Sequence, residues 1–258
     1  MTAQNISLNG LNLQSTSIIT QKFQHEGIVT DQAKMKITHR DGEKLTSYTY
    51  GSRSITLEGH LYNGTASGLD NIVDTFKQSV IGALQVPLVY DYLGSQRQYT
   101  VNVKNVAIAR DYYNINIVPF SIQAEAINPP FAMDIATTTT YSGTSISGAL
   151  STSATFSGTA NPQPTLTFSV TTAGTLSQII FTNSTTNTAL TINLSSVSNG
   201  NSIVVSTSGY TVTKNGAAIT TYSGTYPIFN PGSNSFNVAC SGTGYVYDLT
   251  IGYTAHWL

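Results

Sequence analysis

Apolar and polar residues alternate over much of the first 126 positions, a pattern typical of half-buried β-strands. Residues 33–39 and 44–50 alternate on either side of an Asp-Gly turn at 40–43, which predicts a hairpin. A strand is predicted at 53–62. Its apolar face holds Ile55, Leu57, Gly59 and Leu61, and we assign Arg53, Thr56, Glu58 and His60 to the polar face. Two longer strands are predicted at 98–109 and 113–126, around a turn at Arg110-Asp111.

One segment departs from this alternation, because its apolar residues recur every three or four positions. It predicts the only helix of the chain. Ser67 is the candidate N-cap, Asp70 follows three residues later, and Pro87 ends the pattern. The apolar positions of this helix are Leu69, Ile72, Val73, Phe76, Val80, Ala83 and Leu84.

From Pro164 onward the apolar residues fall in short β-rich runs separated by Asn, Ser and Gly clusters, and no helical period occurs. Asn215-Gly216 is typical of a two-residue hairpin turn. The spacing predicts an antiparallel β-sandwich of about eight short strands. The runs are 166–170, 179–181, 189–194, 203–205, 210–213, 217–222, 235–240 and 245–253.

Charge divides the chain in two. Residues before position 135 hold 21 of the 23 charged side chains, and the remaining 124 residues hold only Lys214 and Asp248. The change falls beside Pro129-Pro130, a pair that fixes an extended backbone. We therefore expect two domains, 1–131 and 164–258. The fold class is mainly β, with a β-sandwich or split-barrel-like first domain that carries the one helix.

The segment 132–163 between these domains is nearly all small and polar, with four consecutive threonines from Thr137. We interpret it as a Ser/Thr-rich linker or arm. An exposed edge structure, an extra layer of strands, an arm toward a neighbouring subunit and a disordered segment all stay open. On this division, residues 164–258 should fold alone.

Several classes of function are disfavoured by composition. The net charge of −1 and the lack of a basic cluster argue against nucleic acid as a partner. No segment has the apolar length needed to cross a bilayer, and residues 1–10 lack the features of a signal peptide. We expect synthesis in a cytoplasm. The single cysteine, Cys240, cannot form an internal disulfide and is interpreted as a small buried apolar residue.

The residues offer little for catalysis. His25, His39, His60 and His256 are scattered, without metal-ligand spacing. Gly242-Thr-Gly244 is typical of a hairpin turn rather than a phosphate cradle, and Asp41 and Glu43 share a polar turn. We assign no catalytic, cofactor-binding or metal-binding residue, and expect no cofactor and no enzymatic activity.

Aromatic residues of the second half suggest an alternative function. Such rings can stack on sugars, and a module that binds glycans of the host cell surface is the second hypothesis; tyrosines also serve as packing within strands. The candidate residues are Tyr222, Tyr226, Tyr245, Tyr247, Tyr253 and Trp257.

The chain resembles the distal tail proteins of siphophages, the long-tailed, non-contractile bacteriophages. The resemblance rests on the strand 53–59 after a charged hairpin, the helix that follows, the later strand ending near Ala126-Ile-Asn128-Pro129, and a C-terminal sandwich. In that sandwich, Tyr210–Gly216 precedes 229–236, and the chain closes on Tyr253-Thr-Ala-His-Trp257-Leu258.

This resemblance implies a structural protein of the virion tail tip, or baseplate, that forms a hexameric ring. The first domain would stack on the tail tube, and a galectin-like second domain would project outward. Tape-measure and receptor-binding or tail-tip proteins would be the other partners, with no membrane involved and synthesis in the cytoplasm of the host bacterium. Residues 164–258 contain only Lys214, Asp248 and His256 as ionisable recognition groups of the kind that sugar-binding galectins use, so the fold name alone does not predict sugar binding.

Overall fold

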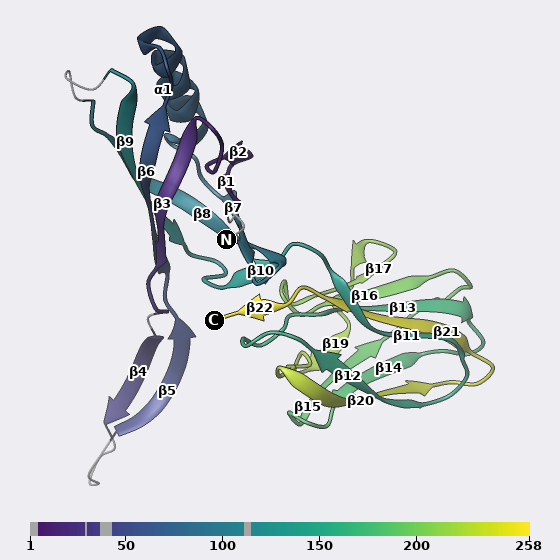
Figure 1. The fold of residues 1–258 in the computed structure, drawn as a ribbon. Helices are drawn as coiled ribbons and strands as arrows, with labels where there is room; N and C mark the ends of the chain where they lie inside the picture. Colours follow the sequence, from purple (N-terminus) through teal and green to yellow (C-terminus); the bar gives the residue numbers. More distant parts are fainter. Residues whose placement is uncertain (1–4, 29, 37–42, 111–114) are drawn as a thin grey trace. The chain divides into compact units, whose positions relative to one another are not determined.

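The computed structural model describes residues 5–28, 30–36, 43–110 and 115–258, with side chains left out at 31, 36 and 43–48. The chain divides into two compact units, one of Met1–Met133 with Leu258 and one of Asp134–Trp257. Both consist mainly of antiparallel strands (Figure 1). The mainly β fold class predicted from the sequence is confirmed.

The main sheet of the first unit has the strand order β2-β1-β7-β8-β9-β6-β3. The sheet curls so that its two sides meet at buried Leu13, which directly follows β2: its N–H donates to the carbonyl of Ile6 in β1 (2.7 Å), and its carbonyl accepts from the N–H of Thr20 in β3 (3.1 Å). The result is the barrel-like arrangement expected for this unit. Its strands are β1 (Ile6–Leu8), β2 (Leu11–Asn12), β3 (Ile18–His25), β6 (Arg53–Tyr62), β7 (Val86–Tyr92), β8 (Ser95–Ile108) and β9 (Ile117–Ala126), and β10 (Ala132–Asp134) also pairs with β8.

Helix α1 (Ala66–Val80) packs on this sheet through Leu69, Val73, Phe76 and Val80, all buried. The predicted N-cap is corrected: Thr65 caps the helix, and its hydroxyl accepts from the Gly68 N–H at 3.2 Å. The helix also ends earlier than predicted. Gly82 takes a left-handed φ of 73°, which ends a helix readily, so Pro87 lies in β7.

Gly59 of β6 allows the Ile19 backbone and the Phe120 ring to approach the strand closely. A Cβ at this position would lie 2.2 Å from the Ile19 carbonyl oxygen and 2.8 Å from the Phe120 ring. The Phe120 ring in turn packs on Phe76 of α1, with the ring centroids 4.8 Å apart. A glycine is therefore required in the middle of β6.

The predicted hairpin is also present. Strands β4 (Thr30–Lys36) and β5 (Glu43–Tyr50) pair antiparallel, from Thr30 opposite Tyr50 to Lys36 opposite Glu43. The predicted turn at 40–43 lies largely outside the described residues, as does most of the turn at Arg110-Asp111.

The second unit is an antiparallel sandwich of two sheets, with orders β11-β21-β13-β16-β17-β18 and β12-β20-β14-β15-β19. Asn215-Gly216 forms the predicted turn between β17 and β18. The strands of the two sheets are β11 (Thr138–Ile146), β12 (Leu150–Phe156), β13 (Thr165–Thr172), β14 (Gln178–Asn183), β15 (Thr188–Asn193), β16 (Ser202–Ser206), β17 (Thr211–Lys214), β18 (Ala217–Ala218), β19 (Tyr222–Gly224), β20 (Gly232–Ser241) and β21 (Val246–Tyr253). The short strand β22 (His256–Trp257) follows them and lies outside both sheets.

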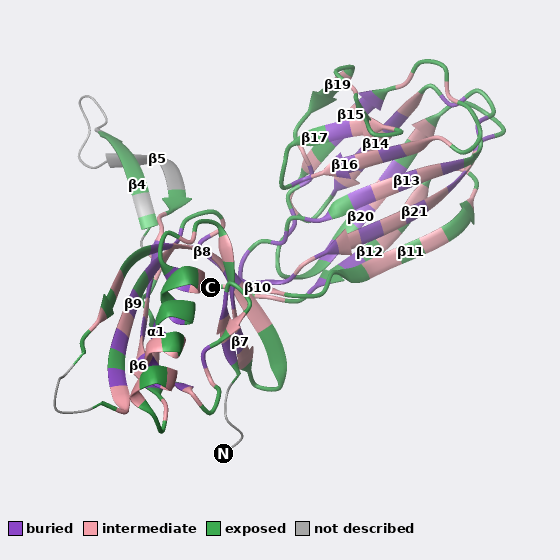
Figure 2. Ribbon diagram, turned by 90° about the horizontal axis from the view of Figure 1, so that it is seen from above, coloured by how far each residue is buried: buried purple, intermediate pink, exposed green. Residues whose placement is uncertain are grey.

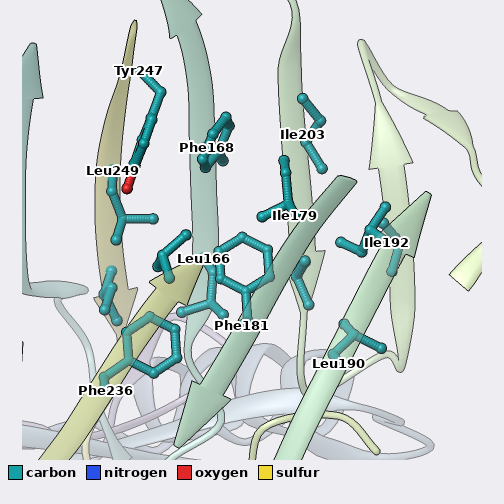
Figure 3. Packing of buried hydrophobic residues seen from close by; sticks show 14 of the residues in the cluster. Leu166, Phe168, Ile179, Phe181, Leu190, Ile192, Ile203, Phe236, Tyr247 and Leu249 are labelled. Atoms are coloured by element: carbon teal, nitrogen blue, oxygen red, sulfur yellow. The ribbon is translucent and has the colours of Figure 1, made fainter. Parts of the chain in front are cut away.

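Buried and less buried positions alternate along these strands (Figure 2), and the buried side chains from the two sheets form one core. Aromatic rings occupy much of it (Figure 3). Phe168 of β13 stacks on Tyr247 of β21 with centroids 4.2 Å apart, and its edge meets Phe181 of the facing sheet at 6.3 Å. Each such ring contributes roughly 1.5–3 kcal/mol by leaving water.

The structure corrects the division predicted around residues 132–163. From Asp134 onward that segment belongs to the sandwich unit and is not a linker: β11 pairs with β21, and β12 pairs with β20 from Leu150 to Phe156. Ser and Thr are suited to these two edge strands because one face of each stays in water, and β-branched Thr fits a pleated backbone. Ala154 and Phe156 supply the buried face of β12. Of the alternatives left open, the exposed edge structure is the one present.

This correction changes the expected behaviour of fragments. Residues 134–258 should fold as a monomer, whereas 164–258 should lose stability and aggregate. The shorter fragment lacks Phe156, which packs on Phe229 and Tyr253, and removing one such ring costs about 3–5 kcal/mol. It also uncovers the edges of β20 and β21. Urea unfolding followed by circular dichroism measures this; equal stability of the two fragments would contradict the assignment.

Candidate assembly surface

The histidines lie apart in the described structure. His25 ends β3, His60 lies in β6, and His39 falls outside the described residues. His256 is buried, its Nδ1 lies 3.3 Å from the Asn161 carbonyl oxygen, and burial lowers its pKa. Burial, together with the Arg53 cation, also lowers the pKa of His25. Among the residues that the structure describes, no three His, Cys, Asp or Glu side chains gather as metal ligands would.

The other polar candidates are not brought together either. Cys240 is half-buried, and burial raises the pKa of its thiol to about 12, so it stays protonated and unreactive at neutral pH. Gly242-Thr-Gly244 forms the predicted turn, with Thr243 accepting from the Thr175 N–H at 2.9 Å. Asp41 and the side chain of Glu43 lie outside the described structure.

The aromatic candidates for sugar stacking divide into two groups. Tyr245, Tyr247 and Tyr253 are buried in the sandwich core. The Tyr247 hydroxyl donates to the Gly148 carbonyl (3.2 Å), and the Tyr253 hydroxyl accepts from the Ser157 N–H (2.7 Å). Trp257 is half-buried and donates to the Asp134 carboxylate at 2.8 Å. These four rings pack within the sandwich unit and do not form an exposed surface on which a sugar could stack.

Tyr222 and Tyr226 are partly buried and contact a third tyrosine that sequence reasoning missed. The ring of Tyr226 meets Tyr222 edge-on at 5.7 Å and Tyr210 edge-on at 5.5 Å. Burial raises the pKa of Tyr226, and the neighbouring Tyr222 adds to the effect. The group packs against the core and leaves mainly Tyr210 exposed.

Arg53 was assigned to the polar face of its strand, and the structure corrects this. It shares the apolar face with Ile55 because positions two apart in a strand point the same way, and it is 3% exposed. Its guanidinium donates to the Tyr99 hydroxyl at 2.6 Å and lies 5.6 Å from the centre of that ring. The hydrogen bond and the ring offset part of the cost of burying the charge, while the Arg53 Nε has no hydrogen-bond partner among the described residues.

Charged side chains of the first unit form three surface ion pairs in the described structure. Lys22 bonds Glu58 at 3.1 Å, Lys104 bonds Glu125 at 2.7 Å, and Arg110 bonds Asp70. The Lys104 hydrogen bond lowers the pKa of Glu125. Exposed pairs contribute little to stability, about 0–1 kcal/mol each. The surface of the first unit therefore carries positive and negative side chains side by side. Such a mixed-charge surface favours specific contacts with a partner of complementary charge.

The hairpin β4–β5 is the strongest candidate for an assembly surface. It forms a two-stranded sheet of its own among the described strands (Figure 1). Its described side chains from Gln32 to Met35 are exposed, and Met35 keeps 55% of its surface in water. At its base, Tyr50 packs edge-on against Phe131 with centroids 5.0 Å apart. A two-stranded hairpin is marginally stable in water by itself, so this one requires a further layer.

Comparison with protein families finds a match within the first unit. Residues 10–125, which include the hairpin, α1 and most of the curled sheet, match the model for the phage tail protein RIFT-related domain. The first unit is therefore similar to phage tail RIFT-related domains over residues 10–125. This match supports the resemblance to siphophage distal tail proteins that was drawn from the sequence.

Solved structures extend the likeness to the second unit. The two units together resemble the Dit protein of phage SPP1, whose structure is presented as a paradigm of the hub adsorption apparatus in phages that infect Gram-positive bacteria. The TM-score is 0.72, the identity is 14%, and the match covers 98% of this chain and 99% of that chain. A chain of the phage P2 baseplate in its Ca-activated conformation matches with a TM-score of 0.48 and 8% identity, over 96% of this chain and 97% of that one.

A search of curated proteins returned no match to this chain. Helix α1, with 15 residues, is too short to span a bilayer, and no other helix in the described part of the chain could do so.

Proposed function

We propose that this protein is the structural hub of a phage tail tip, or baseplate. Copies of the chain close into a ring, six-fold as the family resemblance implies. The ring joins the tail tube and the tape-measure protein to the receptor-binding proteins. The protein resides in the tail tip of the virion after synthesis in the cytoplasm of the host.

The hairpin β4–β5 is the observation that carries this proposal. It belongs to the unit that matches a phage tail family, and it exposes Met35 on a two-stranded sheet that lacks a covering layer among the described strands. A neighbouring copy supplies that layer when a ring closes. The likeness of the whole chain to a phage hub protein supports the same role.

The two units then have different tasks. The first contacts its neighbours and the tube, and its mixed charges fix the register of those contacts. The sandwich is peripheral, and Lys214 and Asp248 are its only charged residues after Asp134.

The hairpin test compares the full-length protein with a variant in which residues 30–50 are replaced by a short Gly-Ser linker. We expect closed rings with a central channel for the wild type in negative-stain microscopy, and monomers for the variant. Met35→Lys should weaken the ring, while Leu84→Lys, a change at another exposed apolar residue of the same unit, serves as the matched control. Wild-type monomers at high concentration would refute the hub, and rings formed by the linker variant would refute the role of the hairpin.

We also propose that the protein has no catalytic activity. The candidate groups do not converge among the described residues, and hydrolysis of a glycan requires a pair of carboxylates. Purified protein incubated with peptidoglycan and polysaccharides should release no reducing sugar above the buffer blank. Turnover that persists through repeated purification would contradict this proposal.

A further inference from the structure

The turn between β7 and β8 holds a leucine where a leucine is unfavourable. Leu93 and Gly94 form a two-residue turn, since Tyr92 pairs with Ser95 on either side of it. Leu93 has a left-handed φ of 49° and Gly94 a φ of 85°. A left-handed backbone crowds the Cβ of most residues. Leu93 is also 91% exposed, so its side chain is not used in the packing of its own domain.

Two other two-residue turns of this chain have asparagine at the position that Leu93 occupies here. Asn9-Gly10 joins β1 to β2 with φ values of 52° and 79°, and Asn215-Gly216 joins β17 to β18 with 49° and 81°. Asparagine tolerates the left-handed region and suits an exposed turn. Leu93 therefore replaces a better turn residue at a cost in both backbone strain and exposed apolar surface, which is a pattern found at functional contacts.

The hairpin presents this leucine rigidly. The Asp91 carboxylate accepts from the Asn5 N–H and from the Gln96 side-chain amide, both at 3.2 Å. The Arg97 guanidinium lies 4.0 Å from the centre of the Tyr92 ring. A turn whose backbone is held in place before binding loses less freedom on contact, so the hairpin presents Leu93 at a fixed position as a knob.

A hollow of matching character lies on the same domain beside α1. Its volume is about 350 Å³ and it opens to solvent. Leu11, Ile18 and Ile72 give it an apolar lining, which short uncharged side chains complete: Asn12, Ser15, Ser17, Asn71 and Thr75. A leucine side chain entering this hollow would bury apolar surface on both partners without burying a charge.

We propose that Leu93 of one copy inserts into the hollow beside α1 of the next copy. Knob and hollow are different patches of one domain, so the contact is heterologous, and its repetition generates a ring where the rotation closes. The inference rests on the proposed ring and names a second, independent contact that holds it, apart from the hairpin β4–β5.

Substitutions test the knob and the hollow separately in the full-length protein. Leu93→Asn restores the residue found in the other two turns, so the monomer should be at least as stable as the wild type in thermal unfolding. The concentration at which rings dissociate, measured by mass photometry, should rise tenfold or more. Thr75→Trp fills the hollow and should have the same effect, while Leu84→Asn, at an exposed leucine outside the turn, should leave that concentration unchanged.

Cross-linking tests whether Leu93 of one copy contacts the hollow of another copy. Leu93→Cys and Thr75→Cys are each made in a Cys240→Ser background, purified, mixed, and treated with a short bis-maleimide. A covalent dimer formed only in the mixture supports the contact. Intact rings that give no mixture-specific dimer, or that tolerate Leu93→Asn at the wild-type dissociation concentration, overturn the inference and leave the hub standing. A wild-type protein that forms no ring overturns the hub, and with it this contact.

Discussion

A pair of antiparallel strands completes only part of its hydrogen bonding and buries little side-chain surface, so it is stable only when another layer or further strands cover it. Most of the described chain meets this requirement internally. Helix α1 covers the curled sheet of the first unit, and the two sheets of the sandwich cover each other. The hairpin β4–β5 is different, because its strands form a sheet of their own and Met35 stays exposed. The proposed ring follows from supplying that missing layer.

The two units differ in the chemistry of their exposed surfaces. The first unit has Lys and Arg beside Asp and Glu, partly joined as surface pairs such as Lys104–Glu125. The sandwich uses Ser, Thr and Asn on its exposed strand faces. It also holds paired polar groups in its interior: the Asn183 side-chain amide donates to the Ile228 carbonyl at 2.7 Å and to the Asn234 side chain at 3.1 Å. A mixed-charge surface favours specific neighbours, and an uncharged one forms few long-range interactions.

Much of the fold could be predicted from periodicity, because alternation and turn residues act locally. The hairpin 33–50, the helix register of Leu69, Val73 and Phe76, and the Asn215-Gly216 turn are all in place. The edge strands β11 and β12 were not assigned, since their Ser/Thr composition is shared by loops and only pairing with β21 and β20 distinguishes the two. Arg53 lies on the same face as Ile55 because of the two-residue period of a strand, whereas its charge favours the polar face.

The assembly surface was beyond sequence reasoning for a different reason. The hairpin stands out because no other described strand pairs with it, and Leu93 stands out because of its left-handed φ. Neither property can be recognised from the pattern of residues in one sequence. Charge gave only the general expectation that the first unit assembles.

Hydrogen exchange of the backbone amides of 30–36 and 49–50 tests the central claim most directly. Monomer and assembled fractions would be separated by size exclusion and labelled under the same buffer. We expect rapid exchange in the monomer, because the lone hairpin opens readily, and strong protection after assembly, because a neighbouring copy covers it. Equal exchange rates in the two fractions, or full protection already in the monomer, would contradict the account.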